Sequence, residues 1–515
     1  MTPSRTGPNI LKRTPAGIQG VPLFVPLGLM AVSLAALLIF VFEFEAVTAY
    51  IERPYLIPWV LATGAVVTAP VIYISRRGQL SFLNPIVFHT LVYFFPVFFV
   101  GGWSLVFGWS NYHYLNYVSD PEWNFPLAFV YVMLGLGGLS FGFLLPVGKK
   151  IGNAIGSKLP NWEFSTNELI FLGVGFVPIG IFLLVAALGS GTAGYQAATE
   201  GPSIREIGSL GVFLSIILPT SLMFLWIALF RMNEWNVSRF AVLGFIVVIS
   251  LFVAATWGSK GALFGALQMF LFAMAYVRKS FSGRQWALIA IGALLVLFIG
   301  VTYGNTFRAQ KGTFGTVTID QYYQHSIDAL YVMWENDLDT QVASAVSSVL
   351  ERVEITSSLA VVVSNHELLA PYEKAYGLEN NIWNYTWTSF IPRLIWKDKP
   401  TIADSNAFNE LYFDATWSGF SITAFGDLLR NFGTLGVPLG MFVLGLFLRI
   451  FYATLVEGVV ASSWKIVLFC LVLPRVNYEA FYGQILPDTM RVAAVVIFQI
   501  LVMRLLVVLY RGSRP

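Results

Sequence analysis

Apolar residues gather along this chain in runs of about 20 positions, with short polar stretches between them. A helix needs about 20 consecutive apolar residues to cross the hydrocarbon core of a bilayer. Twelve runs of this kind predict about twelve membrane spans. They cover residues 22–43, 55–75, 84–107, 125–147, 167–189, 209–230, 240–257, 261–277, 285–304, 434–456, 464–484 and 490–510.

The composition favours the same class of protein. Hydrophobic residues make up 57% of the chain and charged residues 11%, whereas soluble proteins have about 25% charged residues. Cys470 is the only cysteine, which excludes an intramolecular disulfide framework and a cysteine-based metal cluster. No small-residue cleavage site follows the first run, so we expect 22–43 to be a retained anchor.

Lysine and arginine in the short loops predict the orientation of the spans, because these residues concentrate on the cytoplasmic side. If the N-terminus is inside, most of them fall in cytoplasmic loops and at the C-terminus. The external loops then hold only Arg53, Arg205 and Lys260, with Arg491 at the edge of the last span. Both termini are therefore predicted to be cytoplasmic.

About 130 residues without a span separate the ninth run from the tenth. This loop, 305–433, is rich in Trp, Tyr and Phe, so it has enough apolar surface to fold. Within 341–353, valine and leucine recur at helical spacing. The sequence predicts an all-α polytopic membrane protein with spans one to nine in 1–304, a large and mostly helical extracytoplasmic loop in 305–433, and spans ten to twelve in 434–515.

The chain has no glycine-rich phosphate loop, no HExxH motif and no acid-rich calcium loop. Its four histidines lie far apart in the sequence, and Asp337 with Asp339 is more typical of a solvated turn than of a cation site. We therefore expect no metal, no other cofactor and no nucleic-acid partner.

The segment Phe390–Pro400, FIPRLIWKDKP, is a candidate anion site. Arg393, Lys397 and Lys399 are interleaved there with Trp396 and bounded by two prolines, which stiffen the backbone. Arginine offers a fork of donors to phosphate oxygens and lysine offers a point charge. The alternative is that these residues are ordinary basic side chains at the headgroup level.

The rest of the loop argues for a local cluster of cations and against a broad positive surface. Residues 306–425 hold seven basic residues against fourteen acidic ones. The seven are Arg308, Lys311, Arg352, Lys374, Arg393, Lys397 and Lys399.

Residues 421–436 lead from the loop into the tenth span. Asp427 and Arg430 are three residues apart, hence on one face of a short re-entrant helix, and Gly433 predicts a stop and turn after it. A surface ion pair followed by a turn is the alternative interpretation. If Asp427 is buried near the membrane surface, it is a candidate general base.

Charged residues at membrane depth are costly and mark functional sites by default. Lys260 opens the eighth span, where it is either functional or a headgroup anchor. Arg475 lies in the middle of the eleventh span, and Glu479 is placed four residues later to pair with it across one helical turn.

Several of these segments together resemble the Wzy-type polymerases of O-antigen and capsular repeat units. The resemblance rests on topology over the whole chain and on four local pieces. These are Gly258–Gly261 (GSKG), Tyr303–Arg308 (YGNTFR), Phe390–Pro400, and Gly426–Gly433 (GDLLRNFG) with Gly436.

This resemblance implies a membrane glycosyltransferase of the GT-C type, related in fold to O-antigen ligases. Such an enzyme joins polyprenyl-diphosphate-linked repeats at the outer face of the bacterial cytoplasmic membrane by inverting transfer, without a nucleotide sugar and usually without a metal. The partners implied are the lipid-linked glycan donor and acceptor and the lipid bilayer, together with a chain-length regulator and a flippase.

The same resemblance implies roles for the candidate residues. Asp427, where the family often carries Glu, would accept the proton of the attacking hydroxyl, and Arg393 is the first choice for stabilising the leaving diphosphate. Aromatic residues of the loop would stack on sugar rings, or simply pack its core. The diphosphate-binding candidates are Arg308, Arg352, Lys397, Lys399, Arg430, Arg475 and Lys260, and the sugar-binding candidates are Trp396, Trp387 and Tyr385.

Two other functions stay open at this point. An O-antigen ligase would carry a histidine in the segment where this chain has Asp427. A transporter or flippase for lipid-linked glycans suits twelve spans, but not a Trp-rich outer loop of about 130 residues.

Overall fold

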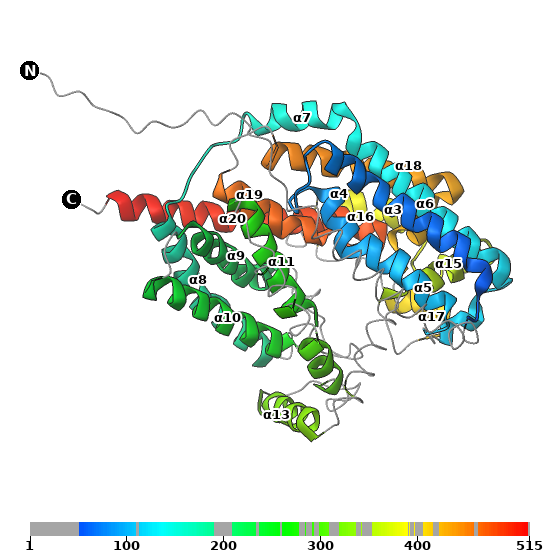
Figure 1. The fold of residues 1–515 in the computed structure, drawn as a ribbon, viewed down its shortest axis with the longest axis horizontal. Helices are drawn as coiled ribbons and strands as arrows, with labels where there is room; N and C mark the ends of the chain where they lie inside the picture. Colours follow the sequence, from blue (N-terminus) through cyan, green and yellow to red (C-terminus); the bar gives the residue numbers. More distant parts are fainter. Residues whose placement is uncertain are drawn as a thin grey trace, which may run out of the picture.

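The computed structural model describes residues 51–109, 113–189, 209–232, 236–257, 260–277, 284, 291–292, 298–307, 319–335, 341, 353–389, 391, 396, 405–415, 422–457 and 462–512. All regular elements in these ranges are helices (Figure 1). Seven of these helices are long and apolar enough to cross a membrane, and two shorter apolar helices accompany them. The prediction of a polytopic α-helical membrane protein is confirmed, whereas twelve spans and their orientation stay predictions. The predicted span 22–43 lies outside the described residues, as does most of 285–304.

The apolar helices form two groups in space (Figure 1). The first group packs around α6 and the second around α9, and α20 contacts helices of both groups. The first comprises α3 (Ile57–Arg76), the continuous run of α4 (Pro85–His89), η3 (Thr90–Val100) and α5 (Gly101–Val106), then α6 (Pro121–Leu144) and α18 (Ala424–Leu455). The second comprises α8 (Thr166–Gly189), α9 (Ser209–Arg231), α10 (Val237–Trp257) and α11 (Lys260–Val277). These helices agree closely with the predicted spans.

Helix α18 is broken near its start. Gly433 has φ 67° and ψ −165°, which separates a short helix before it from the tenth span after it. This left-handed φ is readily adopted only by glycine, and it confirms the predicted stop and turn.

The last two spans differ from their prediction. Helix α19 (Ser463–Val472) has 10 residues, the 3-10 turn η5 (Leu473–Arg475) follows it, and α20 (Tyr482–Gly512) then has 31 residues. The predicted continuous span 464–484 is therefore wrong, and the last helix begins eight residues before the predicted 490. Hydropathy missed the break because residues on both sides of it are apolar and buried.

The loop between the ninth and tenth predicted spans contains four described helices: α13 (Ile319–Glu335), α15 (Thr356–Glu373), α16 (Asn381–Thr388) and α17 (Ser405–Phe413). The first eight residues of α15 are buried, and this helix contacts α5, α6 and α18. Helix α16 contacts α20 and α18. These parts of the loop are packed into the span bundle and do not form a core of their own. Most of the helix predicted over 341–353 lies outside the described residues.

Glu354 occupies a buried position at the start of α15. Its side chain accepts hydrogen bonds from the backbone N–H of Ser357, at 2.9 Å, and from the Ser357 hydroxyl. Glu354 is 1% exposed, and this burial raises the pKa of its carboxyl to about 7 because it disfavours the charged form.

We predict that Glu354 makes the protein less stable as pH rises. A folded-state pKa of about 7 lies above the ordinary value of 4.5, so the stabilising contribution is complete below pH 4.5 and is lost as pH approaches and passes 7. Thermal unfolding measured across this range is expected to show the loss in the wild type. Glu354→Gln is expected to flatten it, and an unchanged pH profile in that variant contradicts the prediction.

Helices α6 and α18 approach so closely that glycine is required between them. A Cβ atom at Gly445 would lie 2.0 Å from the carbonyl oxygen of Leu139, which is backbone and cannot rotate away. Small residues that let backbones approach are typical of helix pairs in membranes.

We therefore predict that Gly445→Ala lowers the free energy of unfolding by about 1–3 kcal/mol, as overpacking does. Gly244→Ala in α10 is the matched control, because nothing lies within 4 Å of the added Cβ atom. Unfolding of both variants in detergent measures the difference, and equal stability of the two would disprove the close packing.

Candidate functional site

The short helix at the start of α18 carries the predicted Asp427–Arg430 pair. Thr423 caps this helix, with its hydroxyl accepting a hydrogen bond from the Gly426 N–H at 3.1 Å. Nη2 of Arg430 lies 2.9 Å from Oδ1 of Asp427, so the two residues share one helical face as their spacing predicts. The pair is buried, however, since the side chains are 0% and 1% exposed. The alternative of a surface ion pair is therefore wrong.

Donors from three elements surround the Asp427 carboxylate. Asn381 at the start of α16 donates at 3.1 Å to Oδ1, and the backbone N–H of Gly483 at the start of α20 donates at 3.1 Å to Oδ2. Asn431 adds a bond of 3.1 Å to Oδ1. Asp427 thus connects α16, α18 and α20.

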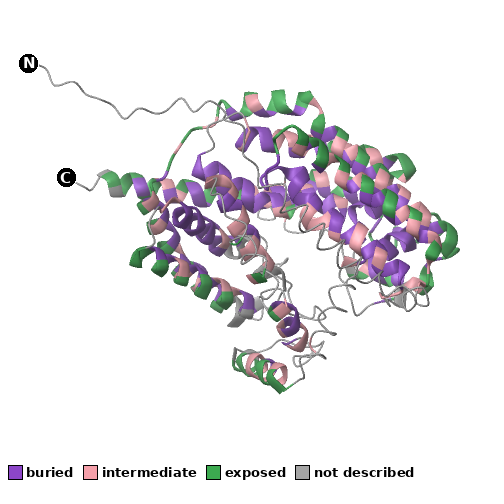
Figure 2. Cartoon of the chain, in the orientation of Figure 1, coloured by how far each residue is buried: buried purple, intermediate pink, exposed green. Residues whose placement is uncertain are grey.

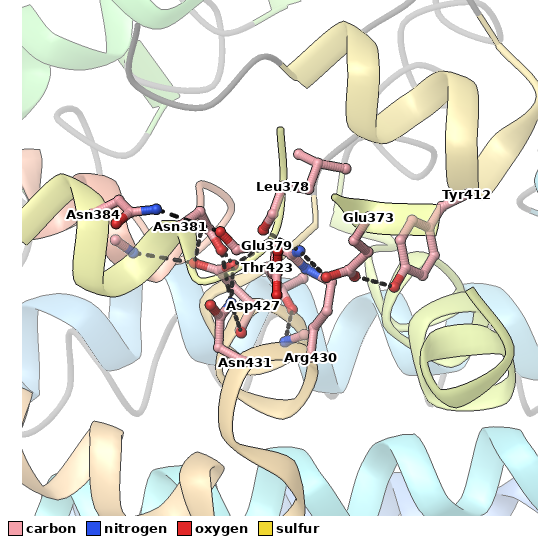
Figure 3. A network of polar contacts seen from close by, with 12 residues as sticks. Glu373, Leu378, Glu379, Asn381, Asn384, Tyr412, Thr423, Asp427, Arg430 and Asn431 are labelled. Carbon is pink, nitrogen blue, oxygen red and sulfur yellow. Dashed lines mark hydrogen bonds and ion pairs between the residues drawn. The ribbon is translucent and has the colours of Figure 1, made fainter. Parts of the chain in front are cut away.

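Arg430 makes a second set of connections (Figure 3). Its guanidinium contacts Oε2 of Glu373 at 2.8 Å, donates to the carbonyl oxygen of Leu378 at 2.9 Å, and donates to Oδ1 of Asn381 at 2.6 Å. The Tyr412 hydroxyl donates to Oε1 of Glu373 at 2.7 Å. We call Glu373, Asn381, Tyr412, Asp427 and Arg430 the Arg430 network.

The Arg430 network joins loop helices to late spans. Its members belong to α15, α16, α17 and α18, and the Gly483 amide adds α20. Burial raises the pKa of Glu373 and of Tyr412, and the Arg430 charge opposes both shifts. In this arrangement Arg430 is occupied by protein groups and Asp427 is closed to solvent. General-base action by Asp427 requires α16 or α20 to move away from it.

Arg475 has a different environment. It ends η5, where the helical backbone of α19 has stopped, and its side chain is exposed although Leu473 and Val476 on either side are buried. Because the helix ends at Val472, Arg475 and Glu479 do not face each other across a helical turn. Among the described residues, Arg475 has no ion pair or hydrogen bond.

Asp488 and Arg491, two charged residues near the start of α20, were not among the predicted site residues. The charge of Asp488 on α20 and the Tyr93 hydroxyl on η3 act on Arg475. Arg491, one turn further along α20, lies 3.9 Å from Asp488. The sequence signal for Asp488 and Arg491 is that both are charged residues inside the last apolar helix. The predicted start of that helix at 490 falls between them.

The aromatic candidates separate into two kinds. The rings of Trp387 and Trp396 stack with centroids 5.8 Å apart, and Trp387 is 44% exposed. Tyr385 is buried on the opposite face of α16, beside Gly483. Trp387 and Trp396 therefore offer accessible rings for a sugar, whereas Tyr385 packs the core.

Six further cations belong to the predicted site. Lys260 begins α11. Arg308, Arg352, Arg393, Lys397 and Lys399 lie outside the described residues. Within the described ranges, no group of three or more His, Cys, Asp or Glu side chains is arranged to hold a metal ion.

Comparison of the chain with models of protein families, with curated proteins and with solved structures gives no match. Any function assigned to this chain therefore rests on its own residues and on their geometry.

We predict that Arg430→Ala lowers the free energy of unfolding by about 3–5 kcal/mol, because it leaves the Asp427 and Glu373 carboxylates buried without a counter-charge. Lys149→Ala removes a pair with Glu457 whose side chains are 46% and 22% exposed, and it is expected to cost at most about 1 kcal/mol.

Chemical unfolding in detergent measures both losses. Combining Arg430→Met with Glu373→Gln and Asp427→Asn removes the uncompensated charges and is expected to restore part of the stability. A loss for Arg430→Ala no larger than that for Lys149→Ala contradicts the role of the network.

Proposed function

We propose that this protein is a polymerase of polyprenyl-diphosphate-linked oligosaccharide repeats, acting at the outer face of the bacterial cytoplasmic membrane without a metal. The observation that carries the proposal is the exposed side chain of Arg475 at the break after α19. Irregular backbone within a membrane protein is tolerated where it is buried in protein or lines a cavity. An accessible arginine at such a break is a natural contact for the diphosphate of a lipid-linked donor.

The reaction requires stabilisation of negative charge on the leaving group. A hydroxyl of the acceptor glycan attacks the anomeric carbon of the donor sugar, the bond from that carbon to the diphosphate oxygen breaks, and polyprenyl diphosphate leaves with the bonding electrons. In the proposal, Arg475 is the fixed cation that offsets this charge without reorganisation. Arg491 is a second cation of the same region, and the Asp488 carboxylate interacts with both arginines.

In the proposal, aromatic residues of the loop bind the sugar rings. Trp387 presents an accessible ring on the face of α16 opposite to buried Tyr385, and Trp396 stacks on it. The chain between α16 and α17 carries the predicted diphosphate contacts Arg393, Lys397 and Lys399. The Arg430 network attaches α16 and α17 to the late spans.

Asp427 has two roles in the proposal. In the enclosed state its carboxylate positions α16 against α20. When α16 separates, the freed carboxylate receives the proton of the attacking hydroxyl.

The proposal predicts that Arg475→Ala lowers the rate of chain extension by about 100-fold or more, the size of effect seen when one fixed donor to a developing charge is removed. The assay is extension of a purified lipid-diphosphate repeat by the purified protein in vesicles, with and without chelator. Arg475→Lys is expected to recover part of the rate, since it keeps the charge and loses the fork. Lys374→Gln, an exposed loop lysine, is the control and is expected to leave the rate unchanged.

Other outcomes distinguish the alternatives. Transfer of one preformed chain to a different acceptor, without growth of lipid-linked repeats, would identify a ligase. Movement of the lipid-linked repeat across the vesicle membrane without any new glycosidic bond would identify a transporter. Full activity of Arg475→Ala at wild-type protein level would disprove the role of Arg475.

A further inference from the structure

Helix α7 (Pro146–Gly156) follows α6 after a single extended residue, Leu145. The ψ of 132° at Leu145 turns the chain, and Pro146 begins the new helix. Figure 1 shows α7 at the edge of the bundle, beside the end of α18. The predicted span 125–147 runs across this turn into the first two residues of α7, and no helix was predicted over the rest of α7.

One face of α7 is fixed against α18. Gly148, Gly152 and Gly156 are its buried residues, and Cβ atoms at the first two would meet Arg449, Ile450 and Ala453 of α18. Because this glycine face packs closely against α18, the remaining faces of α7 point away from α18.

Exposed residues run along α7 (Figure 2), and three large apolar side chains form one side of the helix. Val147, Ile151 and Ile155 recur every four residues and are 53%, 42% and 45% exposed. They continue the exposed apolar surface of α6, where Phe141 is 63% and Leu144 is 43% exposed. In a membrane protein that surface of a span faces lipid, so the apolar side of α7 extends the lipid-facing surface around the turn.

Exposed lysines flank this apolar side. Lys149 lies 3.0 Å from Oε1 of Glu457, which also pairs with Arg449 at 2.6 Å through Oε2. Lys150 and Lys158 are exposed and have no ion pair among the described residues. Within the part of the chain that the structure describes, two positive charges beside α7 thus have no paired anion.

We propose that α7 lies in the headgroup region of the membrane and binds anionic phospholipid through Lys150 and Lys158. An amphipathic helix with an apolar face and lysines beside it binds at this depth by burying the apolar face and attracting anionic headgroups. The continuity with the lipid-facing side of α6 and the uncompensated positive charge select a lipid surface as the occupant. The proposal is independent of the activity proposed above.

The test uses the full chain in vesicles with a fluorophore on Ile151→Cys, in a Cys470→Ala background. Vesicles contain either phosphatidylcholine alone or phosphatidylcholine with one quarter phosphatidylglycerol. Brominated lipid is expected to quench the fluorophore strongly and aqueous iodide weakly. Brominated phosphatidylglycerol is expected to quench at a lower mole fraction than brominated phosphatidylcholine.

Neutralising the lysines tests the contribution of their charge separately from the apolar contact between α7 and the lipid. Each lysine near an anionic surface contributes about fivefold to binding, so Lys150→Gln and Lys158→Gln are each expected to reduce the preference for phosphatidylglycerol by about that factor. Quenching by brominated phosphatidylcholine should persist in these variants, and Lys374→Gln should change neither quantity.

Three results would overturn the proposal. Strong quenching by iodide would place α7 in water. Quenching by neither agent would show that protein covers Ile151, either another part of this chain or a second copy. Equal quenching by the two brominated lipids would remove the role of the lysines.

Discussion

An arginine that is enclosed by protein must find its counter-charges inside the protein, because water does not solvate it there. Arg430 satisfies this constraint with Asp427 from its own helix and Glu373 from α15. The positions of α15, α16 and α17 are tied to that requirement, since Glu373, Asn381 and Tyr412 belong to these helices, and the Gly483 amide of α20 reaches the same site. The loop is attached to the spans by these polar contacts at one buried site and by the buried first eight residues of α15.

Arg430 and Arg475 illustrate how one residue type takes different roles in one bundle. Arg430 binds protein acceptors through both terminal nitrogens of its guanidinium and therefore contributes structure. Arg475 is exposed and without an ion pair or hydrogen bond among the described residues. An anion that binds Arg430 would have to displace these protein contacts. An anion that binds Arg475 would displace no ion pair or hydrogen bond with a described residue. Of these two predicted diphosphate contacts, this difference favours Arg475 at the break after α19 over Arg430.

Hydropathy predicted the spans well where a helix runs unbroken between polar loops, as in α3, α6, α8 and α10. It failed at 464–484, because an apolar segment reads the same whether its backbone is helical or irregular. Spacing predicted the Asp427–Arg430 pair and glycine predicted the turn at Gly433, since both are local. Glu373, Asn381 and Tyr412 come from three other helices, and no local pattern in one sequence relates them to Arg430.

Helix α20 begins where the Gly483 amide binds Asp427 and ends where Arg511 binds both carboxylate oxygens of Glu168 at 2.7 and 2.8 Å. Its 31 residues span about 46 Å. One continuous helix is thus held at its first turn by Asp427 of the loop and at its last turn by the start of α8. A displacement of the loop at Gly483 and a displacement of α8 at Glu168 would therefore both act on the same helix.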